Sequence, residues 1–521
     1  MMQPLVFFNG QIFTGSNANA WVEALVIEKN KIVFSGNNTG ALAYRSPQKI
    51  DLRGKLVLPG FNDAHTHFAE GGKSLIGLNV RGAKNLANFV RLIRDYTHRL
   101  KPGEWVASWG WDHEGWPEKR YPVREDVDSA TPQNPLLLYR SDGHVALANS
   151  LALKTAGIRK AFPVRGGEIL VDPKTGEPTG ILRDRAVHLV AKHIPGLPRS
   201  KRKAAIQAAL KYAARMGVTS IQEMETLPED FELYLELLEK DELTSRVYAV
   251  PLPENRDKFP EVPASDFLRT GGVKLFADGS LGAASARMFE PFNDAPDSTG
   301  LAIYGPGELK QVLQNFHEKG HQICIHAIGT RANYEVLQAF KDVLKAAHNT
   351  GRHRIEHAQM IRKEDLGLMA GLGLITSIQP AHYLGDRRWL VRRIGEKRLP
   401  LAYRIASFFK ARIAVAFGTD WPVEDLNPLA GLFAAVVRSR DLYTPGEGIS
   451  LSAAVRAYTA GSAFAEFSGR KKGRLLAGQI ADFVVLAENI FEMPPEEFKD
   501  IPVVLTLVDG KIVHKTGEAR I

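Results

Sequence analysis

Eight short apolar runs, separated in several places by segments with helical periodicity, limit most strongly what this chain can fold into. Runs without an alternating polar face predict strands buried on both sides, which is typical of a parallel sheet covered by helices. Amphipathic segments such as 204–216, 308–319 and 333–347 predict the covering helices. The eight predicted strands span 56–61, 219–222, 246–250, 273–277, 322–325, 354–356, 374–378 and 413–417. This order predicts an α/β fold of the TIM-like (β/α)8 barrel type.

The predicted barrel occupies residues 55–69 and 196–470, and its first two strands lie much further apart in the chain than a connecting helix requires. Residues 70–195 are therefore predicted to form an inserted subdomain over the active site. Four of the seven tryptophans lie in this insert: Trp105, Trp109, Trp111 and Trp116. They predict either an aromatic wall for a partly apolar substrate or the insert's own hydrophobic core.

The two ends of the chain both consist of short strand-like runs. Residues 1–54 contain several such runs with turn signals between them, and residues 471–521 contain a hairpin signal at Asp509-Gly510. We expect the two ends to pair into one small β-sandwich domain beside the barrel. The first residues read as a strand, because they lack the basic start and the cleavage site of a signal peptide.

Two histidines, His65 and His67, follow the first predicted strand. Residues i and i+2 of an extended segment point to the same side of the backbone, so this pair can hold one metal ion. Four further residues of types that bind metals lie at or near later strands: Lys274, His326, His357 and Asp420. A barrel places its catalytic groups at the carboxyl ends of its strands, so the pattern predicts a metal centre there. A single histidine at a strand end is more often a hydrogen-bonded core residue, so the prediction depends on the whole set.

Lys274 lies within a predicted strand, where a buried ammonium group facing a metal ion would be repelled. Its neutral amine can instead add CO2 and become an anionic carbamate that bridges two ions, because burial lowers the pKa of a lysine. The alternatives are that Lys274 reaches solvent or pairs with Asp278. Two other histidines, His144 and His382, lie in turn-like segments that could reach the mouth of the barrel.

Composition excludes some classes of protein and favours others. The net charge is +9, but the densest basic run, 199–203, has no interleaved aromatic residues, so we expect a basic solvated surface and no nucleic-acid partner. No apolar run reaches the length of about 18 residues that a membrane helix needs, so no membrane partner is expected. Cys324 is the single cysteine, which excludes an internal disulfide and fits a cytoplasmic location.

Longer motifs surround the candidate ligands along nearly the whole chain. They include Leu58-Pro-Gly-Phe-Asn-Asp-Ala-His-Thr-His67, Asp142-Gly-His144, Gly272-Val-Lys-Leu-Phe-Ala-Asp-Gly-Ser280, Ile325-His-Ala-Ile-Gly329, Arg354-Ile-Glu-His357 and Gly418-Thr-Asp-Trp-Pro422. On these motifs the chain resembles the amidohydrolase superfamily. Within it the chain looks like a member of the branch called amidohydrolase family 3, which includes N-substituted formamide deformylase-like proteins.

The resemblance implies a (β/α)8 barrel, a β-sandwich built from both termini and an insert over the active site. It implies metal ligands at His65, His67, Lys274, His326, His357 and Asp420. Members of the family act mainly as hydrolases on carbon–nitrogen bonds other than peptide bonds. We expect two divalent ions per chain, with zinc favoured and iron, manganese or cobalt also suited to histidine and carboxylate ligands, and CO2 for the modification of Lys274.

The chain departs from the family pattern at two positions. Thr330 stands where the family usually has an aspartate, at the predicted start of a helix. Threonine caps a helix slightly less well than aspartate, so we expect little loss of metal binding but the loss of any electrostatic role. The second predicted strand ends in Gln222-Glu223, where an aspartate is more usual, and the extra methylene is expected to alter the shape of the pocket.

The resulting hypothesis is a metal-dependent amidohydrolase that splits a non-peptide, amide-type C–N bond of a small molecule by attack of a metal-activated hydroxide. Asp420 would act first as base and then as acid, and His144 or His382 would help to stabilise the oxyanion. The main alternative is a lactone or phosphotriester hydrolase on the same barrel. The other is a non-catalytic binding protein, against which the retention of all six ligand positions argues. A homodimer is possible, and no feature of the sequence decides the oligomeric state.

Overall fold

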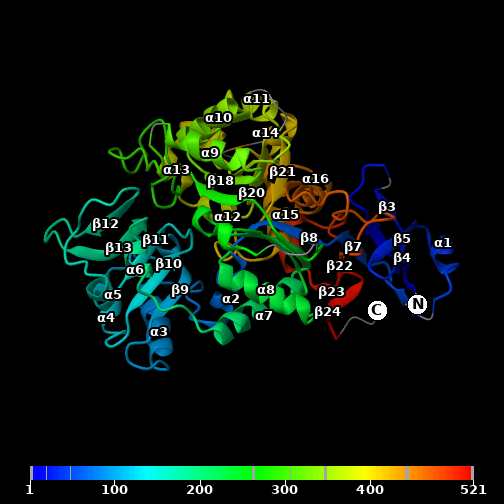
Figure 1. Ribbon diagram of the computed structural model, residues 1–521, viewed down its shortest axis with the longest axis horizontal. Coiled ribbons are helices and arrows are strands. Elements are labelled where there is room, and N and C mark those ends of the chain that lie inside the picture. The colour runs from blue at the N-terminus through cyan, green and yellow to red at the C-terminus, as the bar shows by residue number, and fades with distance from the viewer. Residues whose placement is uncertain are drawn as a thin grey trace.

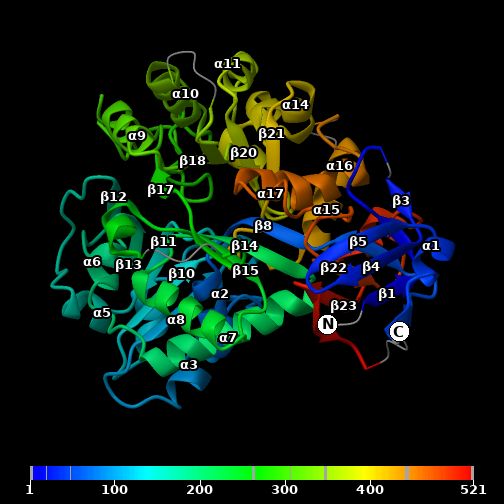
Figure 2. The same ribbon diagram turned by 45° about the vertical axis from the view of Figure 1, so that its right-hand side comes forward.

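The computed structural model has a mixed α/β fold, as the sequence predicts (Figure 1). It describes residues 4–18, 20–46, 48–260, 265–305, 307–344, 349–440, 444 and 446–517. Parallel strands and their helices occupy the middle of the molecule, the insert lies on one side of them, and the two chain ends lie together on the other side (Figures 1 and 2). Within the described residues, no helix combines the length and apolar character needed to cross a membrane.

Two sheets of parallel strands form the core. In the first sheet the order is β16 (Leu268–Thr270), β15 (Arg246–Val250), β14 (Val218–Met224) and β8 (Phe61–Thr66). In the second the order is β17 (Val273–Phe276), β18 (Ile323–Ala327), β19 (Arg354–His357), β20 (Ile375–Ile378) and β21 (Ala414–Phe417). Nearly all of these strand residues are buried, which explains why they read as continuous apolar runs.

Backbone hydrogen bonds connect the two sheets at both edges. The Lys274 N–H at the start of β17 donates to the Pro251 carbonyl just beyond β15, over 2.9 Å. At the other edge the Asp420 N–H, just beyond β21, donates to the His65 carbonyl of β8, over 2.7 Å. The carboxyl ends of β8 and β21 therefore lie side by side, which brings together residues that are far apart in the sequence.

Amphipathic helices cover the outside of these sheets. Their apolar faces bury residues such as Leu210, Phe231 and Phe340 in one continuous core shared with the strands. The covering helices are α7 (Arg199–Arg215), α8 (Pro228–Glu239), α9 (Glu308–Glu318), α10 (Thr330–Leu344), α11 (Asp365–Gly371), α14 (Ile405–Lys410) and α15 (Pro428–Val437). The predicted continuation of α10 to residue 347 lies outside the described residues.

The first predicted strand, 56–61, is wrong as a single barrel strand. Its residues divide between β7 (Leu56–Pro59), which pairs with terminal strands, and β8, which begins at Phe61 and runs through His65. All residues from Leu56 to Thr66 are buried, so their apolar pattern does not mark the break. The break falls at Gly60, where a Cβ atom would lie 2.4 Å or less from two side-chain atoms of Thr219. Strand ends elsewhere differ from the prediction by at most two residues, which is ordinary for boundaries predicted from sequence.

The insert contains a five-stranded mixed sheet. Its order is β12 (Gly167–Val171), β13 (Pro178–Asp184), β11 (Val145–Ala148), β10 (Leu136–Arg140) and β9 (Val106–Trp111). Asparagine caps begin two of its helices: the Asn85 side chain accepts from Asn88 N–H at α3 (Leu86–Thr97), and Asn149 does the same at α5 (Ser150–Thr155). Helix α2 (Phe68–Ile76) packs on α7 and joins the insert to β8.

The chain ends share one small β domain, at the right of Figure 1. A six-stranded sheet combines β2 (Gln11–Phe13), β3 (Trp21–Val22) and β7 with β22 (Phe483–Leu486), β23 (Val503–Val508) and β24 (Lys511–Lys515). A four-stranded sheet of β1 (Leu5–Phe8), β4 (Ala24–Glu28), β5 (Lys31–Gly36) and β6 (Gln48–Asp51) packs on it. Phe7 and Phe483, one from each sheet, meet edge to face at 5.0 Å. The predicted hairpin at Asp509-Gly510 is confirmed, since β23 and β24 pair antiparallel.

Candidate metal centre

Three predicted ligands meet in one buried group at the carboxyl ends of the parallel strands. One nitrogen or oxygen atom from each of His65, His357 and Asp420 lies within 4.8 Å of the others. His65 belongs to β8, His357 ends β19, and Asp420 follows β21. His357 and Asp420 both have left-handed backbone, with φ of 72° and 61°. Such strained conformations persist where the surrounding structure fixes a functional side chain.

Asp420 is the point at which the histidines converge. Its Oδ1 atom lies 3.2 Å from His67 Nε2 and 3.5 Å from His65 Nε2. Its Oδ2 atom lies 3.7 Å from His382 Nε2 and 3.9 Å from His357 Nδ1. One carboxylate therefore faces four imidazoles, which is a donor set that suits zinc and similar divalent ions.

Lys274 and His326 lie next to this group. Lys274 Nζ is 3.3 Å from His65 Nε2, and the His326 ring centroid is 4.6 Å from that of His357. His326 Nε2 is turned to the Gly279 carbonyl, at 3.1 Å. Lys274 does not take Asp278 as its partner, because that carboxylate accepts backbone N–H groups of Arg287, Ile328 and Gly329 over 2.8, 3.0 and 2.8 Å.

Burial sets the protonation of the group. It lowers the pKa of His65, His326 and His357 well below the ordinary histidine value, so these imidazoles are neutral and able to bind a metal. Burial also lowers the pKa of Lys274, although Glu356 acts in the opposite direction. Burial alone would raise the pKa of Asp420, but its hydrogen bond with His67 lowers it overall, so the carboxylate is ionised.

His144 and His382, the two further histidines singled out from the sequence, both lie beside this group. The His144 ring lies 5.2 Å from that of His326, and its Nδ1 atom is 2.7 Å from Asp184 Oδ1. Burial would lower the pKa of His144, but the bond to Asp184 raises it overall. His382 opens α12 (His382–Asp386), and burial lowers its pKa.

Several residues that hold these histidines were missed by sequence reasoning. Glu356 Oε2 lies 2.6 Å from His65 Nδ1, and Glu356 Oε1 lies 2.7 Å from Arg354 Nε, with all three side chains fully buried. Gln379 Oε1 lies 2.8 Å from His357 Nδ1, and Glu225 Oε2 lies 3.3 Å from His67 Nδ1. Sequence reasoning could have found Glu356, because this residue belongs to the Arg354-Ile-Glu-His357 motif that also contains a candidate ligand.

The two positions at which the chain departs from the family pattern both make defined contacts in the structure. Thr330 begins α10, as predicted, and its Oγ1 atom accepts the Phe289 N–H over 3.3 Å. Glu223 Oε1 accepts the Ala69 N–H over 2.8 Å and so ties β14 to α2. Burial raises the pKa of Glu223 to about 8.

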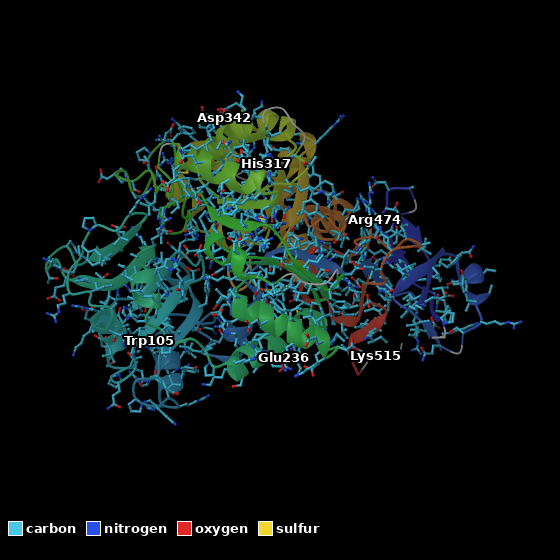
Figure 3. All side chains as sticks on the ribbon, viewed as in Figure 1. Trp105, Glu236, His317, Asp342, Arg474 and Lys515 are labelled. Carbon is cyan, nitrogen blue, oxygen red and sulfur yellow. The ribbon has the colours of Figure 1, made fainter. Side chains whose placement is uncertain are left out.

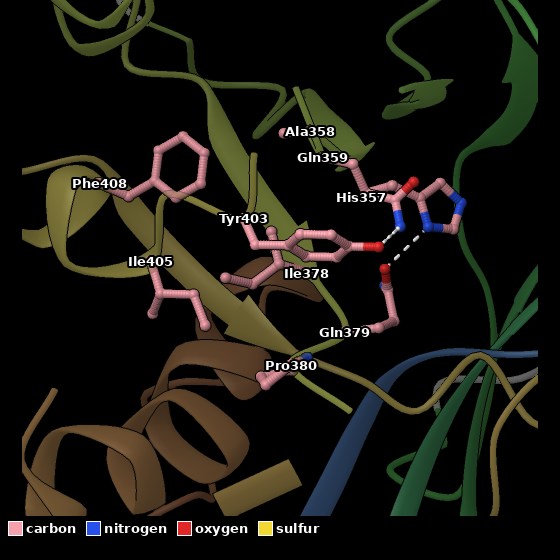
Figure 4. A pocket seen from close by; sticks show the side chains of 9 residues that line it. All are labelled: His357, Ala358, Gln359, Ile378, Gln379, Pro380, Tyr403, Ile405 and Phe408. Carbon is pink, nitrogen blue, oxygen red and sulfur yellow. Dashed lines mark hydrogen bonds between the residues drawn. The ribbon is translucent and has the colours of Figure 1, made fainter. Parts of the chain in front are cut away.

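A small cavity lies behind His357 (Figure 4). Gln379 stands on its polar side and bonds His357, while Gln359 Nε2 donates to the Tyr403 hydroxyl over 2.7 Å. The rest of the lining is mainly apolar: Ala358, Ile378, Pro380, Ile405 and Phe408. With Nδ1 held by Gln379, the other ring nitrogen of His357 is left for another partner.

The chain belongs to the amidohydrolase family, whose model matches residues 48–514. Protein LONG AFTER FAR-RED 3 of Arabidopsis thaliana is 32% identical over 538 residues, which cover 98% of this chain and 91% of that protein. N-substituted formamide deformylase of Arthrobacter pascens is 25% identical over 543 residues, or 99% of each chain. An uncharacterized metal-dependent hydrolase from Pyrococcus furiosus, of known structure, has 31% identity and a TM-score of 0.74 over 93% of this chain and 99% of that one. The predicted family membership is confirmed.

Proposed function

We propose that this protein is a metal-dependent amidohydrolase that cleaves an amide-type C–N bond of a small molecule other than a peptide. The observation that carries the proposal is the buried group of His65, His357 and Asp420 at the strand ends. We take the two parallel sheets as one (β/α)8 barrel, in which this is the place of the active site. The metal-dependent hydrolase from Pyrococcus furiosus, which covers nearly the same length of chain, supports the same class.

The residues present fit a metal centre by the chemistry of their donor atoms. The imidazoles of His65, His326 and His357 have a lowered pKa and lie beside an ionised carboxylate. Lys274 adds a buried amine with a lowered pKa 3.3 Å from His65 Nε2. We propose that His65, His67, His326, His357, Asp420 and a carboxylated Lys274 would hold two divalent ions, with zinc favoured. A bound ion would lower the pKa of its water to about 7 and polarise the substrate carbonyl.

The chain's own residues would then handle protons and charge. Asp420 would accept the proton of the attacking water and pass it to the leaving nitrogen, because its Oδ2 atom faces the site. His382, 3.7 Å from that oxygen, would support it with a neutral imidazole. His144, held at Nδ1 by Asp184, would present its other nitrogen to the developing oxyanion.

The first test is elemental analysis of the purified protein, with metal counted per chain. Two ions would support the two-ion centre with a carboxylated Lys274, and Lys274→Ala should then bind fewer. One ion would keep the hydrolase proposal but remove the bridging role. No ion, even after metal and bicarbonate are added, would overturn the mechanism.

The second test assays a panel of small amides, lactones and phosphotriesters. We expect turnover of amides and none by Asp420→Asn, which should retain most of its metal. An active Asn variant would refute the role of Asp420. Preference for a lactone or phosphotriester would favour the alternative function, a lactone or phosphotriester hydrolase on the same barrel. The predicted domain boundaries, the cytoplasmic location and a homodimer belong to the same proposal and need limited proteolysis, fractionation and sizing experiments.

A further inference from the structure

The candidate histidine ligands differ in what holds the ring nitrogen on the side away from the centre. His65 Nδ1 lies 2.6 Å from Glu356 Oε2, and His67 Nδ1 lies 3.3 Å from Glu225 Oε2. The opposite nitrogens of both rings, Nε2, lie 3.5 and 3.2 Å from Asp420 Oδ1. We call these two histidines, at the carboxyl end of β8, the β8 pair. Each of them lies between two carboxylates.

The two histidines on β18 and β19, the β18–β19 pair, have neutral partners instead. His357 Nδ1 lies 2.8 Å from Gln379 Oε1 (Figure 4), and His326 Nε2 lies 3.1 Å from the Gly279 carbonyl oxygen. Asp278 Oδ1 is 3.5 Å from His326 Nε2, but this carboxylate already accepts three backbone N–H groups. Within the described part of the chain, no carboxylate forms a hydrogen bond with either ring of this pair.

The partner of a metal-binding imidazole affects how strongly that imidazole binds the metal. A carboxylate that accepts the N–H of one ring nitrogen makes the other nitrogen more basic, and losing such a partner typically lowers metal affinity about 10- to 100-fold. Hydrogen bonds to a charged acceptor are about twice as strong as those to a neutral one, so an amide or carbonyl oxygen has a smaller effect. The charges of Glu225 and Glu356 also attract a cation, although Arg354, 2.7 Å from Glu356, offsets part of this attraction.

We propose that the two ion positions of the centre differ in affinity: the ion at the β8 pair binds first, and the ion at the β18–β19 pair binds only at a higher concentration of free metal. This difference in affinity rests on the proposed two-ion centre but not on the proposed reaction. In a medium poor in metal the protein would keep one ion, and the two-ion state would form only when metal is supplied. The number of ions per chain would then depend on the medium as well as on the protein.

Equilibrium dialysis of the full-length protein tests the proposal. The buffers hold free zinc at stepped concentrations with constant bicarbonate, and bound zinc per chain is counted by elemental analysis. We expect two binding steps whose midpoints differ by at least about tenfold in zinc concentration. Glu225→Gln removes the charged partner of His67, so it should weaken the first step about 10- to 100-fold and bring the two steps together. The Glu225 side chain is 35% exposed, so glutamine should not disturb folding.

Glu70→Gln is the matched control for this change. Glu70 and Glu225 are both partly exposed carboxylates that act on the same neighbour: burial raises the pKa of the Tyr139 hydroxyl, and both charges add to the rise. Glu70, however, takes Lys73 as its ionic partner, whereas Glu225 takes His67. Replacing Glu70 should therefore leave both zinc-binding steps unchanged.

Gln379→Glu tests the other pair in the opposite direction. It gives His357 a carboxylate partner in place of an amide, so the second step should become about 10- to 100-fold tighter while the first step stays unchanged. If this buried variant does not fold, the result for Glu225→Gln decides alone.

The proposal is overturned if the unmodified protein fills both positions in one step, if binding ends at one ion, or if Glu225→Gln weakens only the second step. No bound zinc at any concentration would overturn the metal centre itself, and the proposal with it. Two ordered steps without hydrolysis of any amide would support the unequal positions and refute only the proposed reaction.

Discussion

Replacing Glu356 by glutamine tests how the centre is held together. Glu356 joins two buried groups, with one oxygen 2.6 Å from His65 Nδ1 and the other 2.7 Å from Arg354 Nε. Glutamine has almost the same shape but lacks the charge. Whichever way its amide is turned, an NH2 group faces a nitrogen of one partner, and the charge that pairs with Arg354 is lost in either case.

The magnitude follows from burial. Arg354 is fully buried, and after the change it keeps hydrogen bonds only to neutral groups: Gln222, the Cys324 sulfur at 3.1 Å from Arg354 Nε, and the Met224 sulfur. Removing one partner of a buried ion pair costs about 3–5 kcal/mol. We therefore expect the free energy of unfolding of metal-free Glu356→Gln to fall by about 3 kcal/mol. Loss of a carboxylate that orients a metal-binding histidine typically lowers metal affinity about 10- to 100-fold.

Both quantities are directly measurable. Urea unfolding followed by circular dichroism gives the stability, and chelator competition gives the affinity for zinc. Glu236→Gln is the control, because Glu236 on α8 (labelled in Figure 3) pairs with Lys203 and Lys240 on the protein surface. It should change neither quantity measurably. A Glu356→Gln protein with the stability and zinc affinity of the unmodified protein would refute the reasoning.

Three further changes test other parts of the structure. Burial raises the pKa of Glu223 to about 8, so the folded protein keeps a proton that the unfolded chain loses near pH 4.5. The free energy of unfolding measured with urea should therefore fall as pH rises from about 5 to 8. Glu223→Gln should flatten this dependence of stability on pH. Burial, with a smaller effect of His317, lowers the pKa of His353 to about 3. The free energy of unfolding should therefore decline as pH falls below about 6.5, and it should decline less steeply in His353→Gln. A slope unchanged by either variant would contradict its assignment. Gly418→Ala would place a Cβ atom 2.6 Å from the backbone nitrogen of His65. Calorimetry should therefore show a fall of about 1–3 kcal/mol in the free energy of unfolding, and dialysis should show weaker zinc binding. Normal values of both quantities would exclude crowding at this contact.

Local chemistry was enough to predict most of the strands. Seven of the eight predicted barrel strands overlap β14, β15, β17, β18, β19, β20 and β21. They were visible because strands buried on both faces need continuous apolar residues. The exception, 56–61, could not be divided correctly from the sequence. Strands β7 and β8 belong to different sheets, but both are buried, so their residues form one continuous apolar run.

The candidate ligands were also visible from the sequence, because few residue types bind metals and they follow apolar runs in a fixed order. Their distances from one another were not visible. The sequence could not distinguish His357, which joins the group with His65 and Asp420, from His326, whose Nε2 atom turns to the Gly279 carbonyl. That difference depends on ring orientations set by neighbouring chain segments.

The sequence by itself determined the α/β class, the family and the residue types available for a metal centre, because each depends on local composition and spacing. Only the tertiary structure decided that Glu356 holds His65 and that Trp109 alone among the insert's tryptophans reaches His67. The physical reason is that these contacts join segments tens to hundreds of residues apart. A bulge at Gly110 and the side-by-side ends of β8 and β21 bring them together, and neither is encoded in a local pattern.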